Sequence, residues 1–471
     1  MGLSFFNTLS HSIQEFVPLD ANSKKVGMYC CGPTVYDFAH IGNWRTFVFG
    51  DLVRRYLIFR GYDVMHVMNI TDVEDKIIRR VRETKTTLRE FTSQYETAFF
   101  DDMKTLGCHL PHVTPRATEY IAEIISLIEK LITRGIAYQA ADGSVYFSIE
   151  KYRGCGCNYG KLVKLNFDEM RTGERVVSDE YEKESLADFA LWKARTPDDG
   201  DVSWPSPWGQ GRPGWHIECS AMSMKVLGTS FDLHLGGEDL KFPHHEDEIA
   251  QSEGATGKPF VKYWLHGAFL LVEGKKMSKS LGNFFTLRDL VAKGFTGREV
   301  RYLLLSAHYR GTFNFTLDGL TGARASLARI DACIIKLREL AATATGTPPS
   351  GGSPQLVADF TAALDGDLNI SAAWAAIFDW VSDTNKHIAG KNLTPADAAA
   401  LLVTWDQINS VLGIETVAGT EAPLEICALL EARQAARKAK DFKRSDEIRD
   451  ALKANGWVVE DSPKGPKLKK I

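Results

Sequence analysis

The sequence lacks any apolar stretch that approaches the roughly 20 residues needed to cross a bilayer as a helix. Residues 1–20 also lack the basic-then-apolar order of a secretory signal. Eight cysteines are present, but their spacing is unlike the framework of a small disulfide-stapled domain. We therefore expect a cytoplasmic protein without a membrane partner, whose cysteines are core residues, metal ligands or nucleophiles.

An excess of positive charge is also missing. The 56 lysines and arginines against 60 acidic residues give a formal net charge of −4, which excludes a generally basic coat for nucleic acid. A local basic patch is not excluded, because phosphates respond to the field where they dock. With 471 residues, 44% of them hydrophobic, the chain exceeds what one core usually supports, so roughly two to four domains are expected.

A strand, a helix and a strand follow one another near the start. Residues 26–31 form an apolar run that ends in a Cys-Gly-Pro-Thr turn. Apolar residues recur at helical spacing over 43–59, and 64–68 form a second apolar run. This βαβ pattern predicts an α/β fold with a parallel sheet, to which 231–235 and 263–272 should add strands.

The pattern changes further along the chain. About residues 115–207 carry helical segments, Gly-rich turns and many charges, which predicts an insertion within a first domain that spans 1–296. Residues 297–415 are helical throughout in their spacing, and a basic helical module follows at 422–471. The helices expected in the bundle are 324–340, 355–364, 372–388 and 395–412, with a loop at 343–354.

The segment His40-Ile41-Gly42-Asn43 lies at the predicted start of the first helix. A helix N-terminus offers unpaired N–H groups and a positive dipole end, which suit a phosphate. Gly42 would let a nucleotide approach the backbone, and His40 and Asn43 could donate hydrogen bonds to phosphate oxygens. Four residues are weak evidence alone, since a histidine at a helix start is more often a capping or packed residue.

The segment from Lys275 to Asn283 reads Lys-Lys-Met-Ser-Lys-Ser-Leu-Gly-Asn and follows a predicted strand. Small and polar residues between lysines predict a mobile loop, which could bring Lys276 and Lys279 to the charge that develops on phosphate. An isolated lysine cluster would more simply be a solvated surface. The His-Ile-Gly-Asn segment at the start of a helix comes first in the chain, and the lysine segment after a strand comes later. Their occurrence together in this order favours a site that uses ATP.

Four residues far apart in the sequence form a possible metal-binding set: Cys31, Cys219, His244 and Glu248. Two thiolates, an imidazole and a carboxylate suit Zn²⁺. His244 and Glu248 share a face if their segment is a helix, whereas His245 would lie off it. Cys30 is the neighbour most easily mistaken for Cys31, although a strand points the two to opposite faces. Taken singly, each residue could equally be core filler or a solvated face.

The His-Ile-Gly-Asn and Met-Ser-Lys-Ser segments resemble the signature pair of class I aminoacyl-tRNA synthetases, with Asn43 where the best-known form has a second histidine. Further segments are similar to those of cysteinyl-tRNA synthetases: Cys-Gly-Pro-Thr-Val-Tyr-Asp, Asn-Ile-Thr-Asp, Gly-Trp-His-Ile-Glu-Cys-Ser-Ala-Met and Phe-Pro-His-His-Glu. The similarity covers most of the chain, which is identified as a member of this family.

The resemblance implies a Rossmann-type catalytic domain that converts L-cysteine and ATP, with Mg²⁺, into cysteinyl-adenylate. It then implies transfer of cysteine to the 3′ end of tRNA(Cys) by a monomer that holds one zinc ion. The implied zinc ligands are Cys31, Cys219, His244 and Glu248, and the cysteine pocket contains Gly32, Thr71, Trp215 and His234. The implied ATP site contains His40, Gly42, Asn43, Gly237, Asp239 and Lys279, with His40, Asn43, Lys276 and Lys279 in catalysis.

The basic final module is the expected tRNA-binding part, and the resemblance implies that it binds the anticodon. Its candidate contacts are Arg437, Lys438, Lys440, Arg444 and Arg449. Phe442 and Trp457 could stack on bases or simply pack the module. Two other functions remain open: a ligase that joins cysteine to an amino sugar, whose known forms lack such a module, and a non-catalytic RNA-binding relative. Cys155-Gly156-Cys157 favours a surface turn over a metal site.

Overall fold

The structure is a computed structural model that describes residues 2–163, 188–278, 281–344, 352–414, 424–438, 441–462 and 465–470. The chain divides into two compact units, Met1–Ile414 and Glu415–Ile471, and each is described by itself. None of the helices in the described ranges is long and apolar enough to cross a membrane.

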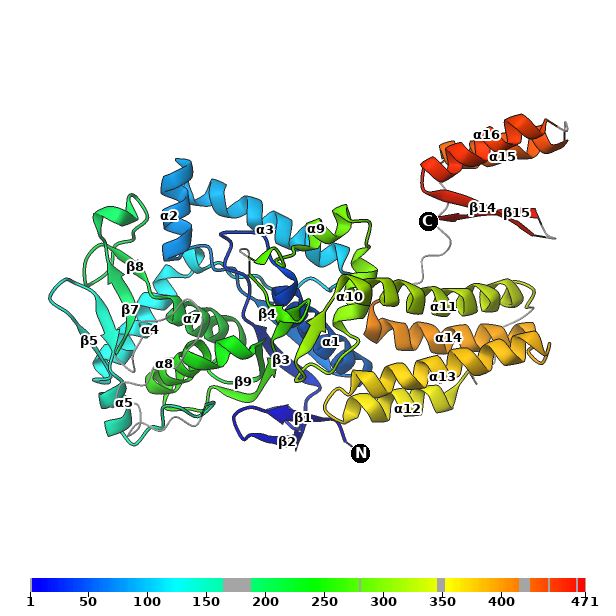
Figure 1. Cartoon of the computed structure of the whole chain (residues 1–471). Coiled ribbons are helices and arrows are strands. Elements are labelled where there is room, and N and C mark those ends of the chain that lie inside the picture. Colours follow the sequence, from blue (N-terminus) through cyan, green and yellow to red (C-terminus); the bar gives the residue numbers. More distant parts are fainter. Residues whose placement is uncertain are drawn as a thin grey trace. The chain divides into compact units, whose positions relative to one another are not determined.

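A parallel four-stranded sheet forms the centre of the first unit, in the order β10-β9-β3-β4 (Figure 1). Its strands are β3 (Lys25–Cys30), β4 (Asp63–Met68), β9 (Phe231–Gly237) and β10 (Val261–Gly267). Helix α1 (Ile41–Phe59) connects β3 to β4, as the βαβ pattern predicted. The predicted α/β fold with a parallel sheet is therefore confirmed.

Alternate residues of β3 face different layers. Met28 and Cys30 belong to the large apolar core that also contains Trp44 of α1. Tyr29 and Cys31 belong to a second core on the other side of the sheet. That core also takes in α7 (Trp215–Leu227) and α8 (Glu246–Thr256), so helices cover both faces of the sheet.

A second, antiparallel sheet begins in the segment expected to be an insertion and extends just past its predicted end at 207, in the order β5-β6-β7-β8 (Figure 1). Its parts are β5 (Ala137–Gln139), β6 (Val145–Phe147), β7 (Phe189–Ala194) and β8 (Gly211–Pro213), with α4 (Ile121–Thr133) and α5 (Ile149–Gly154). The sequence predicted only helices and turns here. Three of the four strands have three residues, which is too short for a period of two to stand out.

The strand expected at 263–272 is in fact two strands, so this prediction was wrong. β10 ends at Gly267, and β11 (Leu270–Val272) joins a separate sheet with β12 (Lys275–Lys276) and β13 (Phe313–Phe315). The break lies at Ala268, whose N–H donates to Tyr309 O, a residue outside both strands. β13 also interrupts the stretch from 297 that was expected to be helical throughout.

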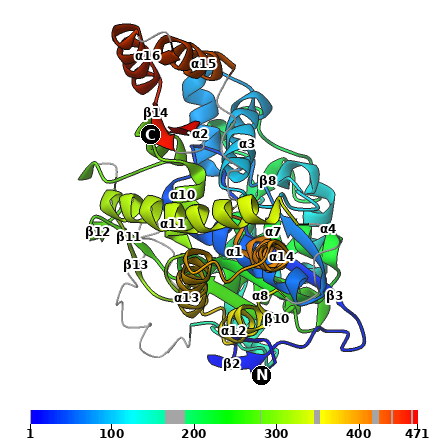
Figure 2. The ribbon, with the colours of Figure 1, turned by 90° about the vertical axis from the view of Figure 1, so that its right-hand side faces the viewer.

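Four long helices form the bundle after β13 (Figure 1), and Figure 2 turns that side of the ribbon toward the viewer. They are α11 (Leu317–Ala341), α12 (Pro354–Asp365), α13 (Ile370–Ala389) and α14 (Pro395–Leu412). Arg301 of α10 (Gly297–Leu304) is fully buried and joins the bundle to α1. Its guanidinium donates to Leu412 O at 2.7 Å and to Asp51 Oδ2 at 2.5 Å.

The remaining elements of the first unit are β1 (Ser4–Asn7), β2 (Ser12–Glu15), α2 (Asp75–Thr84), α3 (Leu88–Thr105) and α9 (Leu287–Ala292). The second unit contains α15 (Leu424–Lys438), α16 (Phe442–Ala454), β14 (Trp457–Ser462) and β15 (Gly465–Lys470). The hairpin of β14 and β15 was not expected from the sequence, which predicted a helical module with a charged tail. Ile426, Ile448, Leu452 and Trp457 form the core of this unit.

Candidate active site

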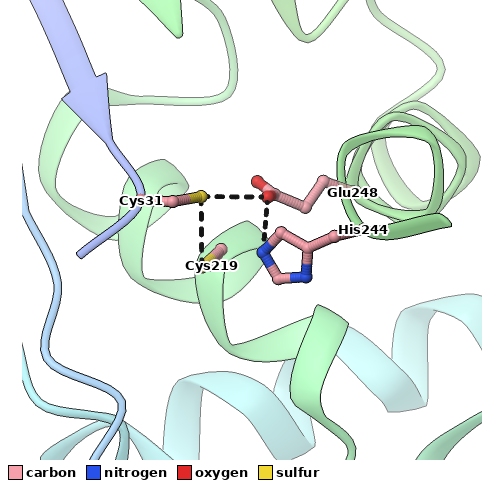
Figure 3. A group of neighbouring side chains, drawn as sticks. All are labelled: Cys31, Cys219, His244 and Glu248. Carbon is pink, nitrogen blue, oxygen red and sulfur yellow. Dashed lines mark hydrogen bonds and ion pairs between the residues drawn. The ribbon is translucent and has the colours of Figure 1, made fainter. Parts of the chain in front are cut away.

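Four side chains converge beyond the carboxyl ends of β3 and β9, although as many as 217 positions separate them in the sequence (Figure 3). They are Cys31, Cys219, His244 and Glu248, and all are buried. One donor atom from each lies within 4.8 Å of the others. The structure thus brings the entire predicted metal-binding set together: Cys31 follows β3, His244 and Glu248 follow β9 at the same edge of the sheet, and α7 brings Cys219 to them.

The short contacts in this cluster determine which groups are charged. Cys31 Sγ donates to Cys219 Sγ at 3.9 Å, and this hydrogen bond lowers the pKa of Cys219 to about 6 despite burial. Burial raises the pKa of Glu248, but the electrostatic interaction with His234 and hydrogen bonds with His234 and His244 lower it to about 2. The site therefore holds a thiolate and a carboxylate near neutral pH, which are the forms that bind a metal cation.

A series of polar side chains orients the His244 ring. Its Nδ1 lies 2.8 Å from His216 Nδ1, and His216 Nε2 lies 3.4 Å from Asp247 Oδ2. Tyr159 then donates to Asp247 Oδ1 at 2.5 Å. These contacts turn Nε2 of His244 toward Glu248 Oε1, 3.1 Å away, as partners behind a metal-binding histidine do. The sequence did not reveal this chain.

His245 lies closer to the cluster than the helical-face argument placed it. Its Nε2 is 3.4 Å from Cys31 Sγ, and its Nδ1 is 2.8 Å from His266 Nε2. Positions three apart also share one face of a helix, and His245 Nε2 lies 4.0 Å from Glu248 Oε1, so the argument from positions four apart was incomplete for His245. His234 and His245 with Cys31 and Glu248 form a second set of donor atoms within 4.8 Å.

The residues expected around substrate cysteine lie beside the same cluster. The Trp215 ring is 4.3 Å from the His244 ring, and His234 Nε2 is 2.9 Å from Glu248 Oε2. Gly32 and Thr71 are linked through a residue to which the sequence assigned no role. Asn69 accepts from Gly32 N at 2.8 Å and donates to Thr71 Oγ1 at 3.2 Å.

A side chain at position 32 would have no room. A Cβ on Gly32 would lie 1.6 Å from the Asn69 backbone oxygen, so the close approach of the two strand ends requires glycine.

Glu218 is a second residue to which the sequence assigned no role. It precedes Cys219 on α7 and is fully buried. Neither of its carboxylate oxygens has a hydrogen-bond partner in the described part of the chain, and burial raises its pKa well above the usual range. An acidic residue inside an otherwise buried helical segment was the only sequence signal for it.

The predicted phosphate-binding segment caps α1. His40 Nδ1 accepts from Asn43 N at 3.2 Å, and Asn43 Oδ1 accepts from His40 N at 3.1 Å. Because Nδ1 accepts a hydrogen bond, the proton of the neutral imidazole lies on Nε2. A Cβ on Gly42 would lie 3.3 Å from Met277 Cε, so the lysine segment lies against the start of this helix.

Asn283 is the anchor of the lysine segment. It is buried, accepts from Ser278 N at 2.8 Å, and donates to Lys276 O at 3.0 Å and to Val272 O at 3.2 Å. The Lys276 side chain is exposed, and Lys279 lies outside the described residues.

We predict that Asn283→Ala slows adenylate formation by roughly tenfold without changing the KM for cysteine. The three hydrogen bonds, each of which contributes about 1 kcal/mol, hold the segment that delivers the lysines. Cysteine-dependent exchange between ATP and pyrophosphate measures this rate. Asn314→Ala is the matched control, since Asn314 Oδ1 accepts from Gly274 N at 2.7 Å, in the turn that precedes the lysine segment. An equal loss in both variants would contradict the anchoring role.

The other expected nucleotide contacts follow β9 directly. Gly237 ends the strand, and the exposed Asp239 lies in the short helix η3 (Glu238–Leu240). A Cβ on Gly237 would lie 2.2 Å from Asp239 Oδ1, so a larger residue would displace this carboxylate.

The candidate tRNA contacts lie in the second unit. Arg437, Arg444 and Arg449 are exposed on α15 and α16, and the last two pair with acidic neighbours. The backbone of Lys438 ends α15, but its side chain, like all of Lys440, lies outside the described residues. Trp457 is 5% exposed and packs the core, whereas Phe442 is 64% exposed.

The remaining cysteines lie elsewhere. Cys30 Sγ faces α1, where it would be 3.3 Å from a Cβ on Gly50. Cys108 and Cys333 are buried, and Cys155 is exposed after α5. In the described ranges, neither Cys155 nor Cys157 belongs to a group of possible metal ligands.

Models of known protein families match most of the chain. The family model described as "tRNA synthetases class I (C) catalytic domain" matches residues 16–325. A DALR domain matches 359–416, and a "Cysteinyl-tRNA ligase anticodon binding domain" matches 420–466.

Similar proteins were found among both curated sequences and solved structures. A cysteine–tRNA ligase of Chlamydia muridarum is 47% identical over 482 residues, which cover 100% of each protein. One from Protochlamydia amoebophila is 44% identical, covering 99% of this chain and 98% of the relative. A methionyl-tRNA synthetase of Mycobacterium tuberculosis, solved with methionyl-adenylate, shares the fold at 16% identity and a TM-score of 0.61. That match covers 87% of this chain and 94% of the other.

Proposed function

The chain belongs to the cysteine–tRNA ligases of the class I aminoacyl-tRNA synthetases, and we propose that the cluster beyond β3 and β9 is the site of its reaction. As a member of this family it is a ligase that activates L-cysteine with ATP and attaches it to tRNA. The convergence of four buried donor groups at the end of the parallel sheet is the observation that carries the assignment of the site.

We propose that Cys31, Cys219, His244 and Glu248 hold one zinc ion. The donor set fits this metal, because the pKa values of Cys219 and Glu248 are already lowered to about 6 and about 2. When bound, zinc would ionise and hold the thiol of substrate cysteine, which a serine hydroxyl cannot match.

The chain's own residues orient the substrate at this site. The Trp215 ring next to His244 forms one wall of the pocket. Gly32 and Thr71, held by Asn69, form another. The carboxylate of cysteine is already the nucleophile that attacks the α-phosphorus of ATP. Most of the rate enhancement therefore comes from position and charge stabilisation.

The start of α1 and the lysine segment supply the groups for ATP. The helix N-terminus offers N–H groups and a positive dipole end, and Nε2–H of His40 can donate to phosphate. Asn43 orients phosphate without adding charge. Lys276 and Lys279 neutralise charge on the reacting phosphate and on pyrophosphate, with Gly237 and Asp239 near the nucleoside and Mg²⁺ bound with ATP.

The second unit takes the tRNA. Its exposed arginines Arg437, Arg444 and Arg449, with Lys438 and Lys440, are the proposed phosphate contacts, and the enzyme is proposed to act as a monomer.

We predict that the enzyme discriminates cysteine from serine by about 10⁴-fold or more in activation itself, because a site built for one polar group strongly rejects an analogue that lacks it. The test is exchange between ATP and pyrophosphate with each amino acid, with and without tRNA. The proposal predicts no stimulation of ATP hydrolysis by serine and tRNA. Rapid ATP consumption with serine, without accumulated product, would show that editing provides the discrimination instead.

A further inference from the structure

A small cavity lies in the first unit, where α1 meets the end of β10 and the bundle. A water-sized sphere can move its centre through about 10 Å³ of this cavity, which is room for one water molecule or one monatomic ion. Among the residues that line it are Arg45, Phe49 and Leu52 of α1, Gly267 of β10, Leu304 of α10 and Ile370 of α13. Arg45 is the only charged residue in this lining.

The guanidinium of Arg45 is buried and only partly hydrogen-bonded. Arg45 is 4% exposed, and its Nη2 donates to His308 O at 3.1 Å and to Gly311 O at 2.7 Å. Its Nε and Nη1 have no hydrogen-bond partner among the described residues. A native protein rarely leaves buried donors unpaired unless a water or a ligand accepts from them.

The unpartnered donors of Arg45 lie at the cavity. His308, whose carbonyl oxygen the guanidinium contacts, stands between Ala307 and Tyr309 in the chain, and both of these line the cavity together with Arg45. Because Nη2 already donates to two carbonyl oxygens, Nε and Nη1 are the nitrogens left to serve an occupant.

Arg45 also lacks an acidic partner. The other arginine described at the junction of α1 and the bundle, Arg301, donates to Asp51, whereas burial alone shifts the pKa of Arg45, with no contribution from a described carboxylate. Asp367 is already paired, since it accepts from Arg310 Nε at 2.7 Å. Burial lowers the pKa of Arg45 only to about 10, so the guanidinium is charged near neutral pH. A buried charge without a counter-charge is costly to the folded state.

We propose that this cavity binds a chloride ion, which accepts hydrogen bonds from Nε and Nη1 of Arg45. Both unpartnered groups are donors on a cation, so the best occupant only accepts hydrogen bonds and carries a negative charge. A water molecule brings no charge, and its hydrogens need acceptors that the apolar side chains of the wall do not offer. Carboxylates and phosphates are larger than one water molecule, whereas a halide fits the volume.

The ion would join three parts of the first unit. Arg45 lies in the second turn of α1, and the other walls of the cavity belong to β10 and to the helices α10 and α13. A chloride ion that neutralises Arg45 there should stabilise the folded enzyme in proportion to its occupancy. None of the four residues of the metal-binding cluster lines this cavity, so the inference does not rest on the proposed function.

Thermal unfolding of the metal-loaded full-length enzyme measures the binding of chloride. Sodium chloride replaces sodium glutamate at constant ionic strength, and the general effect of the two salts acts on all variants alike. Relative to Arg45→Met, the wild-type unfolding temperature should rise by roughly 1–2 °C for each tenfold increase in chloride once the site is mostly occupied. The same chloride response in wild type and Arg45→Met would overturn the proposal.

Two further variants separate binding from a change in the fold. Gly267→Ala keeps Arg45 but adds a methyl group to the cavity wall, where its Cβ would meet only Phe49 Cδ1, at an ordinary contact distance of 3.8 Å. It should lose most of the chloride response, and a full response would count against the site. Arg310→Met removes an arginine of the neighbouring loop that is paired with Asp367 and should keep the response. Its loss in Arg310→Met as well would show a general effect of charge.

Diffraction locates the ion. Crystals of the full-length enzyme soaked in sodium bromide should give an anomalous peak within hydrogen-bonding distance of Nε and Nη1 of Arg45. The peak should be missing from crystals of Arg45→Met treated in the same way. Density in the wild-type cavity without an anomalous signal would identify a water molecule only and would refute the halide site.

Discussion

Replacing Cys219 by serine should abolish metal binding and cysteine activation together. Cys219 is the cluster's thiolate near neutral pH, with its pKa lowered to about 6 by the hydrogen bond from Cys31. A serine hydroxyl does not ionise at this pH and is a poor zinc ligand. We expect metal content to fall to a small fraction of one ion per chain, and the activation rate to fall by about 10³-fold or more.

Atomic absorption measures the metal, and exchange between ATP and pyrophosphate measures activation. Cys30→Ser is the matched control, because Cys30 is also buried but faces α1 on the other side of the sheet. It should keep its metal and its activation rate, with a cost of about 1–3 kcal/mol in stability, the range for burying a hydroxyl in an apolar core. Full zinc occupancy in Cys219→Ser, or equal metal loss in both variants, would remove Cys219 from the ligand set. His244→Ala should behave like Cys219→Ser.

A chain truncated after Ile414 should still form cysteinyl-adenylate but should charge tRNA poorly. The truncation follows the boundary between the two compact units, and the second unit has an apolar core of its own. The donor cluster and the start of α1 all lie in the first unit. Removing several cations that neutralise phosphates should weaken tRNA binding by about 10²-fold or more at moderate salt.

The arginines can be tested in the complete chain. Joint replacement of Arg437, Arg444 and Arg449 by alanine should weaken tRNA binding and reduce the slope of its salt dependence by roughly one for each phosphate that is no longer neutralised. Equal charging of tRNA by the truncated and full-length proteins at the same salt would contradict an anticodon-reading role. If neither charges tRNA while both ligate an amino sugar, the assignment to tRNA fails as well.

The sequence alone was sufficient where local rules decide the structure. The apolar spacing over 43–59 predicted α1, which begins at Ile41 and ends at Phe59, because a helix largely buried between a sheet and other helices needs a long apolar pattern. Three bundle helices were predicted to within two residues at each end, and α14 to its bounds, for the same reason, whereas α11 begins seven residues before the predicted start at 324. Short strands such as β5 and β13 were missed because three residues show no period.

For the residues of the site, too, the sequence predicted their identity and the tertiary structure decided their geometry. The types and order of Cys31, Cys219, His244 and Glu248 carried the resemblance to a family, and that resemblance named them as a set. Their distances, and the partners that lower the pKa of Cys219 and Glu248, depend on strand ends that meet only after the sheet has formed.

Tertiary structure alone decided the roles of three neighbours that local rules could not place. His245 Nε2 lies 3.4 Å from Cys31 Sγ, a contact between residues 214 positions apart that exists only once α8 has packed against the sheet. Asn283 holds the lysine segment in place, because it is hydrogen-bonded both to Ser278 within the segment and to Val272 of the strand before it. Glu218 is fully buried and neither of its carboxylate oxygens has a hydrogen-bond partner among the described residues. A sequence pattern records which residues are present, whereas the isolation of a buried carboxylate exists only once the chain has packed around it.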